Sequence, residues 1–326
     1  AYVTLEPCAF HGRTPPCVDA LIEAGIGRVV VPLEDPHERV SGRGLQRLRE
    51  AGVEVESGLL AEQAEDLNPG FLKRMRTGRP WLRVKSAVSL DGRTGLASGE
   101  SQWITGEAAR RDVQRWRARS SAVLTGSGTV LADDPRLNAR VAGSVRQPLR
   151  VVADSRWRTP VNSRLLAAGG DVLLAGVGEP PVALADGGAD CLTLPAGEGG
   201  IDLGALLDEL GRRGVNEVQV EAGSRLCGAL LQAGLVDEIL LYVAPVLLGD
   251  GAFIRGRLSA FGSDFVTRLV AELEIVEIRA LGRLCGLGDL AGIVVDRENR
   301  RPKAVTAQVE RDQAEPAADV EHRQRG

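Results

Sequence analysis

The sequence predicts an α/β protein of two domains, on the strength of three observations. Its 326 residues exceed the usual size of one domain. Short apolar β-type runs alternate with helical segments, which is typical of sheets with parallel strand pairs. A basic connector, residues 68–79, ends at Pro80 and divides this pattern. We therefore expect domains at residues 1–70 and 81–296, a linker at 71–80 and a disordered polar tail at 297–326.

The first domain shows a β-α-β-α-β order. The expected strands are Tyr2–Leu5, Arg28–Leu33 and Gly52–Glu56, and the expected helices are Cys17–Ala24 and Gly44–Ala51. Gly25 follows the first helix, where glycine commonly ends a helix. The chain opens inside a strand-like segment, and Met75 is its one methionine. We therefore expect an N-terminally truncated chain.

The second domain again alternates strands and helices. Its expected strands are Trp81–Ser89, Ala122–Thr125, Leu149–Ala153, Asp171–Ala175, Glu217–Glu221, Glu238–Pro245, Leu273–Ala280 and Leu290–Val295. Its expected helices are Glu107–Arg119, Asp202–Arg213 and Ser224–Ala233. The segment Glu238–Gly249 is the expected interface strand of a homo-oligomer.

Composition narrows the class of protein. The net charge of −4 gives no general attraction to nucleic acid or to anionic membranes. No apolar run reaches the roughly 18–20 residues that span a bilayer, and no signal peptide is present, so we expect a cytoplasmic protein. The five cysteines are an odd number and do not form a disulfide pattern, which favours metal-binding or core roles.

Cys8 and Cys17 are the candidate metal ligands. Cys8 ends a β-type segment, and Cys17 follows Pro16 at the start of a helix, where free N–H groups favour a thiolate. Two such thiolates can hold Zn²⁺, but a catalytic zinc needs a third protein ligand and an open position for water. Nucleobase deaminases take that ligand and a proton-shuttling glutamate from a His-x-Glu helix. No His-x-Glu occurs in this chain.

Two motifs around these cysteines carry a family resemblance. Thr-Leu-Glu-Pro-Cys at residues 4–8 and Gly-Arg-Thr-Pro-Pro-Cys at residues 12–17 resemble the deaminase domain of the RibD-type bifunctional riboflavin-biosynthesis family. The resemblance implies a partial cytidine-deaminase-like α/β/α domain with Cys8 and Cys17 as zinc cysteines and the His-x-Glu motif upstream of Ala1. Because the His-x-Glu motif is absent from this chain, we expect that the chain does not catalyse deamination. The alternatives are His11 as a substitute ligand or as a loop residue lining the substrate site, and two buried, unligated thiols.

Two glycine-containing turns in the second domain are candidates for phosphate binding. Glu221–Gly228 reads as a strand-to-helix turn whose free N–H groups suit a phosphate. Gly126-x-Gly128-Thr129 is a second loop that a ligand could approach closely. Neither turn matches the Rossmann fingerprint. Each alone is weak evidence for phosphate binding, and the alternative is an ordinary turn that binds no ligand.

Longer segments of the second domain resemble the reductase of the same family. They are Trp81–Arg93, Ser98–Thr105, Arg110–Arg117 and Gly126–Leu137. The resemblance covers about residues 81–296 and implies a dihydrofolate-reductase-like α/β fold that uses NADPH.

The resemblance also implies the site residues. The residues implied to line the NADPH site are Ala87, Trp103, Thr129, Asp133, Ser155, Gly223, Ser224, Arg225, Leu226, Cys227, Gly228 and Ala229. Those implied to line the substrate site are Ser101, Arg117, Leu137, Arg140 and Glu221. Lys85 and Asp133 are the catalytic candidates. The alternatives are a solvent-facing Lys85 and a purely capping role for Asp133 and Asp134 before Pro135. Cys191, Cys227 and Cys285 are expected in the core.

The function implied is reduction of 5-amino-6-(5-phosphoribosylamino)uracil, a small phosphorylated ribosylaminopyrimidine, by hydride delivery to C1′. The cofactor carries the chemistry, and arginines suit the phosphate. The full-length protein would also deaminate the diaminopyrimidine precursor at zinc. The alternatives are a reductase-only protein with a non-catalytic deaminase remnant, a zinc-stapled binding module, and a pteridine or folate reductase.

Overall fold

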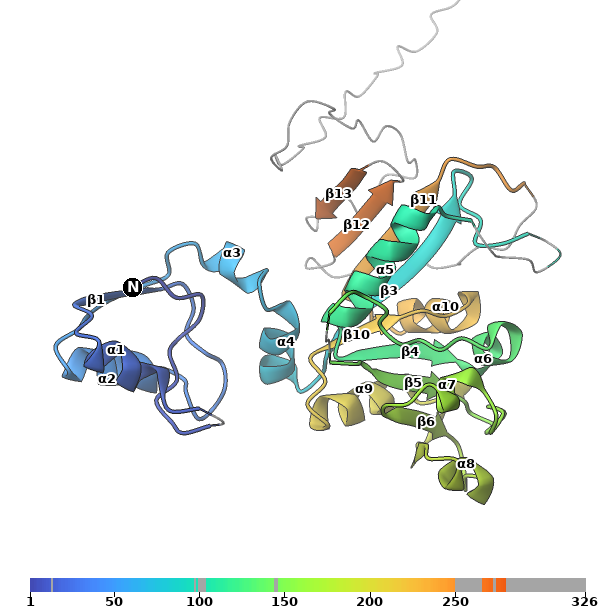
Figure 1. Ribbon diagram of the computed structural model, residues 1–326, viewed down its shortest axis with the longest axis horizontal. Helices are drawn as coiled ribbons and strands as arrows, with labels where there is room; N and C mark the ends of the chain where they lie inside the picture. The colour runs from blue at the N-terminus through green and yellow to red at the C-terminus, as the bar shows by residue number, and fades with distance from the viewer. Residues whose placement is uncertain are drawn as a thin grey trace, which may run out of the picture. The chain divides into compact units, whose positions relative to one another are not determined.

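The computed structural model places the chain in the α/β class (Figure 1). It describes residues 1–249, apart from 13, 97, 99–103, 144 and 145, together with the backbone of the strands at 266–271 and 274–279. All of these lie in one compact unit, Ala1–Gly286. The expected strand Leu290–Val295, the expected tail and Cys285 lie outside the described residues. No described helix is long and apolar enough to cross a membrane.

The N-terminal part is a small parallel sheet packed against two helices. Strands β1 (Arg28–Val31) and β2 (Glu54–Ser57) pair in parallel, and helices α1 (Cys17–Glu23) and α2 (Arg43–Glu50) contribute to one apolar core. The buried members of that core are Val18, Val29, Val31, Leu45, Leu48 and Val53. Gly25 has a φ of 67°, which fits its predicted role after α1. The expected strand at residues 2–5 is present only as a single bridge between Tyr2 and Val30.

A buried carboxylate organises the loop before α2. Glu6 is 4% exposed and accepts four backbone N–H bonds, from Asp35 (3.0 Å), Gly42 (2.9 Å), Gly44 (2.8 Å) and Leu45 (3.3 Å). A Cβ atom on Gly44 would lie 1.9 Å from the carbonyl oxygen of Pro7. Only glycine therefore lets α2 approach the strand end that leads into Cys8.

The predicted linker contains a helix. After the short α3 (Ala61–Glu65), α4 spans Pro69–Thr77 and packs on the larger sheet. Lys73 pairs with Asp237 at 2.5 Å, and Arg74 Nε donates to Asn216 Oδ1 over 2.6 Å. A Cβ atom on Gly70 would lie 2.6 Å from the Asn216 carbonyl oxygen. Residues 69–77 are thus a docked helix, while the domain boundary near Pro80 stays a prediction.

The larger sheet has nine described strands in the order β13-β12-β11-β3-β10-β4-β5-β6-β7. All neighbouring pairs are parallel except β12 with β13. The strands are β3 (Trp81–Ser89), β4 (Ala122–Gly126), β5 (Leu149–Ala153), β6 (Val172–Gly176), β7 (Asp190–Thr193), β10 (Glu217–Val220), β11 (Glu238–Ala244), β12 (Val266–Ala271) and β13 (Glu274–Arg279). A separate two-stranded hairpin joins β8 (Ala196–Gly197) to β9 (Gly200–Ile201). Central strands such as β4 are buried along almost their whole length, as parallel strands covered on both faces should be.

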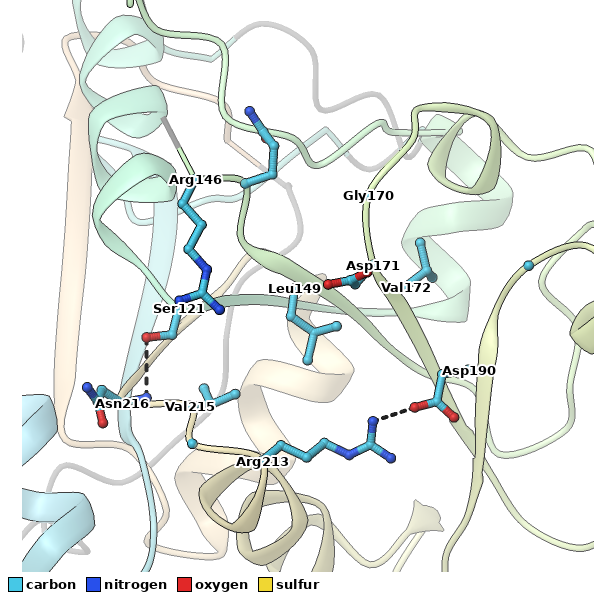
Figure 2. A pocket seen from close by; sticks show the side chains of 13 residues that line it. Ser121, Arg146, Leu149, Gly170, Asp171, Val172, Asp190, Arg213, Val215 and Asn216 are labelled. Carbon is cyan, nitrogen blue, oxygen red and sulfur yellow. Dashed lines mark hydrogen bonds and ion pairs between the residues drawn. The ribbon is translucent and has the colours of Figure 1, made fainter. Parts of the chain in front are cut away.

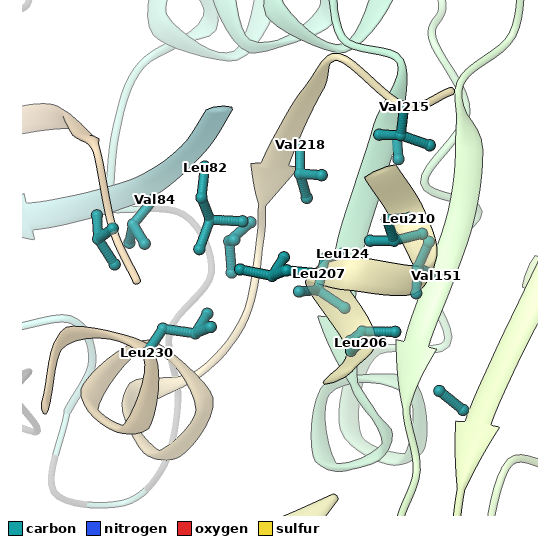
Figure 3. Close-up of a cluster of buried hydrophobic side chains, with 14 of the residues drawn as sticks. Leu82, Val84, Leu124, Val151, Leu206, Leu207, Leu210, Val215, Val218 and Leu230 are labelled. Carbon is teal, nitrogen blue, oxygen red and sulfur yellow. The ribbon is translucent and has the colours of Figure 1, made fainter. Parts of the chain in front are cut away.

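Helices cover the two faces of this sheet. One face packs on α9 (Leu203–Arg212) and α10 (Ser224–Gln232), where Leu206, Leu210 and Leu230 meet the strands (Figure 3). The other face carries α5 (Glu107–Arg119), α6 (Ser127–Asp133), α7 (Arg164–Ala167) and α8 (Val182–Asp186), which contribute to two further clusters. The result is a three-layer α/β/α arrangement.

Several elements differ from the sequence-based expectations. β12 and β7 were not expected, because β12 follows a stretch without strand signals and β7 is a short, half-exposed edge strand. The helices α6, α7 and α8 were also missed; they have only four to seven residues, too few for a clear helical period. The expected interface strand β11 lies between β3 and β12 in the sheet interior, so both of its backbone edges are paired.

Candidate active site

The two predicted metal cysteines lie together. The backbone N–H of Cys17 donates to Cys8 Sγ over 3.4 Å, and that of Val18 donates to the Cys8 carbonyl oxygen over 3.2 Å. Cys8 is half-buried and Cys17 is exposed, so the alternative of two buried core thiols is wrong. The hydrogen bond with Cys8, and then burial, raise the pKa of the Cys17 thiol.

A catalytic zinc needs a third protein ligand beside these two thiols. Across the described part of the chain, no His, Cys, Asp or Glu side chains gather in a group of three that could hold a metal ion. His11 is exposed in the loop between the cysteines and belongs to no such group. The pair therefore fits two positions of a zinc site, and the described residues do not complete it.

The predicted reductase residues gather at the carboxyl edge of the large sheet. Strands β3, β10, β4 and β5 are consecutive neighbours and run parallel, so their carboxyl ends meet there. Glu221 follows β10, Thr129 lies in α6 just after β4, and Ser155 comes just after β5. Lys85 and Ala87 lie on β3, with Lys85 beside Leu240 in the register. Ligands of parallel α/β sheets commonly bind at this edge.

Arg117 and Glu221 form a buried bidentate ion pair at this edge. Arg117 Nε donates to Glu221 Oε1 over 2.6 Å and Nη2 donates to Oε2 over 2.7 Å. Both side chains are about nine-tenths buried. Gln219 Nε2 adds a bond of 2.7 Å to Glu221 Oε1. Burial by itself raises the pKa of Glu221, but Arg117, Lys85 and Gln219 outweigh it and lower the pKa, so the carboxylate is ionised.

Lys85 lies within electrostatic reach of this pair. Burial lowers the pKa of Lys85, Glu221 opposes that shift and Arg117 adds to it. Its ammonium nitrogen lies 5.8 Å from the ring centroid of Tyr242, whose hydroxyl donates to Asp112 Oδ2 over 2.8 Å. Lys85 is therefore not the solvent-facing strand lysine of the alternative reading.

The loop between α6 and β5 presents the other substrate candidates. Leu137 is 2% exposed and packs in the core, whereas Arg140 is exposed. The N–H of Arg140 donates to Gln114 Oε1 over 3.0 Å, and its guanidinium donates to Asn138 Oδ1 over 3.0 Å. The Asn138 carbonyl oxygen accepts from Arg117 Nη1 over 3.2 Å, which joins this loop to the Arg117–Glu221 pair.

The two glycine-containing turns lie side by side. A Cβ atom on Gly126 would lie 3.6 Å from Leu226 Cδ2, and Thr125 Oγ1 donates to the Glu221 carbonyl oxygen over 2.7 Å. The segment Gly223–Arg225 is exposed at the start of α10, with open space beside Gly223. Cys227 is fully buried in the core, as expected, and its neighbour Gly228 is buried too. Neither residue therefore offers exposed surface to a cofactor in this structure, and their cofactor contacts stay a prediction.

Asp133 and Asp134 differ in role. Asp133 ends α6 and is exposed. Asp134 has a φ of 40° after that helix, and its Oδ1 accepts from the N–H of Arg164 over 2.7 Å. Asp134 thus binds the first N–H of α7, which is a different contact from the cap expected before Pro135. Ser101 and Trp103 lie outside the described residues.

A separate hollow opens at the opposite, amino-terminal edge of the sheet (Figure 2). It has a volume of about 470 Å³, and Arg146, Asp171 and Asn216 are among its lining residues. Arg213 in its wall pairs with Asp190. None of the predicted site residues lines it.

Sequence reasoning missed the partners that hold the site. Gln219, Asn138 and Asp112 fix Glu221, Arg117 and Tyr242, respectively. Gln219 carried one usable signal, because it is two residues before Glu221 and side chains at that spacing share a strand face. Asn138 and Asp112 carried none, since their contacts span different elements.

Comparison with known proteins agrees with this arrangement. Residues 80–283 match the model of the RibD C-terminal domain family. The riboflavin biosynthesis protein RibD of Escherichia coli is 52% identical over 295 residues, which is 86% of this chain and 79% of that protein. RibD of Bacillus amyloliquefaciens is 39% identical over 292 residues, covering 86% of this chain and 76% of that protein.

Solved structures show the same fold. Acinetobacter baumannii RibD, form 1, superposes with a TM-score of 0.71 at 47% identity, covering 81% of this chain and 72% of that one. A Thermotoga maritima diaminohydroxyphosphoribosylaminopyrimidine deaminase/5-amino-6-(5-phosphoribosylamino)uracil reductase gives a TM-score of 0.70 at 31% identity, covering 81% and 74%. On the family match and these relatives, the chain belongs to the RibD family.

Proposed function

We propose that this chain reduces 5-amino-6-(5-phosphoribosylamino)uracil with NADPH in riboflavin biosynthesis. The observation that carries the proposal is the buried Arg117–Glu221 pair beside Lys85 at the carboxyl edge of the parallel sheet. The names of its RibD relatives and the Thermotoga maritima structure point to the same reaction. A dihydrofolate or pteridine substrate would leave the arginines of this edge without a phosphate to bind.

The exposed turns supply the cofactor site in this proposal. Gly223–Arg225 and Gly126–Thr129 offer backbone N–H groups on adjacent turns, and Ser155 and Ala87 flank them. The proposal also keeps Asp133 as a catalytic candidate and as an NADPH-site residue. It keeps Trp103 and Leu226–Ala229 in the NADPH site. NADPH, when bound, supplies the hydride.

The side chains of the edge then act on the ribose and its phosphate. Reduction breaks the C1′–O4′ bond, adds a hydride to C1′ and requires a proton at O4′. The pKa of Lys85 is lowered, which makes its ammonium a readier proton donor, and we assign that proton transfer to Lys85. Arg117 and Arg140 hold the 5′-phosphate, with Ser101 and Leu137 beside the ribose. Glu221 is occupied by Arg117 and Gln219, so it orients Arg117 and tunes the charge on Lys85.

The proposal extends to organisation and surroundings. We assign residues 1–70 to a deaminase-type domain, 71–80 to the connection, 81–296 to the reductase domain and 297–326 to a tail. A cytoplasmic location, the absence of a nucleic-acid or membrane partner, and homo-oligomer formation stay predictions from the sequence.

A second activity, zinc-dependent deamination of the diaminopyrimidine precursor, is favoured by one contact. Cys8 and Cys17 lie within hydrogen-bonding distance and suit two zinc ligands. Since the described residues include no third ligand, we assign this activity to a protein that also supplies His-x-Glu. The zinc content of the purified chain distinguishes a zinc-binding deaminase part from a reductase-only protein. A content far below one ion per chain supports the reductase-only alternative.

Oxidation of NADPH, followed by absorbance, tests the main proposal. The deaminated ribosylaminouracil phosphate and its diaminopyrimidine precursor are offered separately. We expect turnover of the first only. Lys85→Met should abolish this turnover while NADPH binding persists. If neither substrate is reduced by a folded chain, the reductase proposal fails.

A further inference from the structure

The loop at residues 134–140 forms a platform that is anchored at two points. Asp134 and Leu137 are non-glycine residues in the left-handed region, with φ of 40° and 52°. Such backbone strain persists only where the surroundings fix it, and it often marks functional sites. Here the Asp134 carboxylate holds the N–H of Arg164, and the buried Leu137 anchors the loop in the core. Between these two anchors stands Arg136, whose side chain is exposed.

Four arginines lie on or beside this platform. Arg136 and Arg140 belong to the loop, the N–H of Arg164 bonds to Asp134, and Arg117 Nη1 donates to the Asn138 carbonyl oxygen. After burial, the like charges of Arg117, Arg136 and Arg164 lower the pKa of Arg140, and Glu221 opposes them. Glu221 is already engaged in the bidentate pair with Arg117. Among the residues described, no carboxylate forms an ion pair with Arg136, Arg140 or Arg164.

The excess of arginine over carboxylate charge beside this loop favours binding of a dianionic ligand. The four positive charges outnumber the Asp134 and Glu221 carboxylates beside them, and a bound dianion would offset the excess. Guanidinium groups match phosphate oxygens with paired N–H donors, and several of them can share one phosphate. The hydrogen bonds of Arg117 and Arg140 to Asn138 fix the inner half of such a site. Arg136 and Arg164 are exposed beside it, and their charges act on Arg140.

We propose that Arg136 and Arg164 form the outer half of the substrate's phosphate site and set its preference for a phosphorylated ribose. This inference rests on the proposed function, because it refines how that substrate is bound. Arg136 comes from the loop and Arg164 from α7, so the phosphate is held between two elements that the Asp134 bond already ties together. Both are specificity-determining residues and take no part in hydride or proton transfer.

Substitution can test each side chain cleanly. The bond between Asp134 and Arg164 uses the backbone N–H of Arg164, so Arg164→Ala keeps it. Arg146→Ala is the matched control, since Arg146 is an exposed arginine that lines the hollow at the opposite edge of the sheet. Arg136→Lys, which keeps the charge but loses the planar fork of donors, is the conservative variant.

Binding of ribose 5-phosphate and of unphosphorylated ribose is measured by calorimetry, together with KM and kcat for the reduction. We expect Arg136→Ala and Arg164→Ala each to weaken ribose 5-phosphate binding about five- to tenfold. Both should raise KM by a similar factor, leave kcat nearly unchanged and leave ribose binding unaltered. Arg136→Lys should recover part of the loss, and Arg146→Ala should behave as the parent chain.

The outcomes separate the two proposals. If the parent chain reduces its substrate and binds ribose 5-phosphate, but both alanine variants bind it as tightly, the outer phosphate site is refuted and the reductase assignment stands. If the alanine variants lose kcat instead of raising KM, the specificity role is wrong. A parent chain that neither turns over substrate nor binds ribose 5-phosphate overturns the proposed function itself.

Discussion

Glu221→Gln should destabilise the reductase part strongly, because it leaves the Arg117 guanidinium buried without its counter-charge. The pair is bidentate, at 2.6 and 2.7 Å, and each side chain is about 10% exposed. Breaking a buried ion pair from one side typically costs about 3–5 kcal/mol of unfolding free energy. The difference in unfolding free energy between the parent chain and Glu221→Gln should become smaller in acid. The pKa of Glu221 is lower in the folded than in the unfolded chain, so the carboxylate stabilises the fold above its unfolded pKa and loses this effect as the pH falls.

The chain offers a matched control with the same geometry and little burial. Arg79 and Asp208 are also bidentate, at 2.6 and 3.0 Å, but their side chains are 37% and 49% exposed. Exposed pairs contribute about 0–1 kcal/mol, so Asp208→Asn should change the unfolding free energy by no more than that. The contrast isolates burial as the cause.

Urea unfolding followed by tryptophan fluorescence is the appropriate assay. All four tryptophans lie beyond residue 80, so the signal reports the reductase part. With a slope of about 2–3 kcal/mol per molar urea, a loss of about 3–5 kcal/mol lowers the midpoint by about 1–2.5 M. The double variant Arg117→Met/Glu221→Leu should regain most of the stability but no activity. A midpoint for Glu221→Gln within the range of Asp208→Asn would refute the reasoning, since the pair would then behave as a solvated one.

Three further outcomes follow from other parts of the structure. Glu6→Ala removes the acceptor of four N–H groups and should lower the unfolding free energy of the N-terminal part by roughly 2–4 kcal/mol. Hydrogen exchange of the amides before α2 measures this loss. Unchanged protection of those amides would contradict the anchoring role of Glu6. The Asp91 carboxylate accepts hydrogen bonds from the Ser89 hydroxyl and from the N–H groups of the loop after β11. These bonds, the Ser89 bond above all, lower the pKa of Asp91 from 3.8 to about 2. Its contribution is therefore complete above about pH 4 and is lost as the pH falls towards 2, so Asp91→Asn should flatten the acid limb of a stability–pH curve. Cys17 is exposed, whereas Cys227 is buried and burial raises its pKa to about 11. Alkylation at pH 8 with peptide mass spectrometry should therefore label Cys17, slowly because its pKa is also raised, and spare Cys227 in the folded chain.

Local patterns predicted much of the fold. The strands β3, β4, β5, β6, β10 and β11 and the helices α5, α9 and α10 occur within a few residues of their expected limits. Their apolar runs and helical periods are long enough to be read without neighbours. The contact between Cys8 and Cys17 was equally accessible, because both lie in one short loop whose residues carry the family motif.

The linker and the strand pairing could not be read in this way. Residues 69–77 look like a basic connector, yet they form a helix because Lys73 and Arg74 find acceptors on Asp237 and Asn216. β7 is a four-residue strand at the edge of the sheet, where pairing with β6 outweighs a weak local preference. β12 consists largely of strand-forming residues, and the local pattern could not show that it pairs with β11 and β13.

The sequence by itself determined the α/β class, the two cysteines and the identity of the charged residues at the carboxyl edge. Only the tertiary structure decided which charges meet. Arg117 and Glu221 are 104 residues apart, and they pair because α5, which packs on β11 and β3, brings Arg117 to the residue that follows β10. The placement of Arg164 beside the loop that carries Arg136 and Arg140 likewise depends on how that loop and one short helix approach each other. Charge acts through space over a few ångströms, and distance along the chain says little about it once parallel strands bring their ends together.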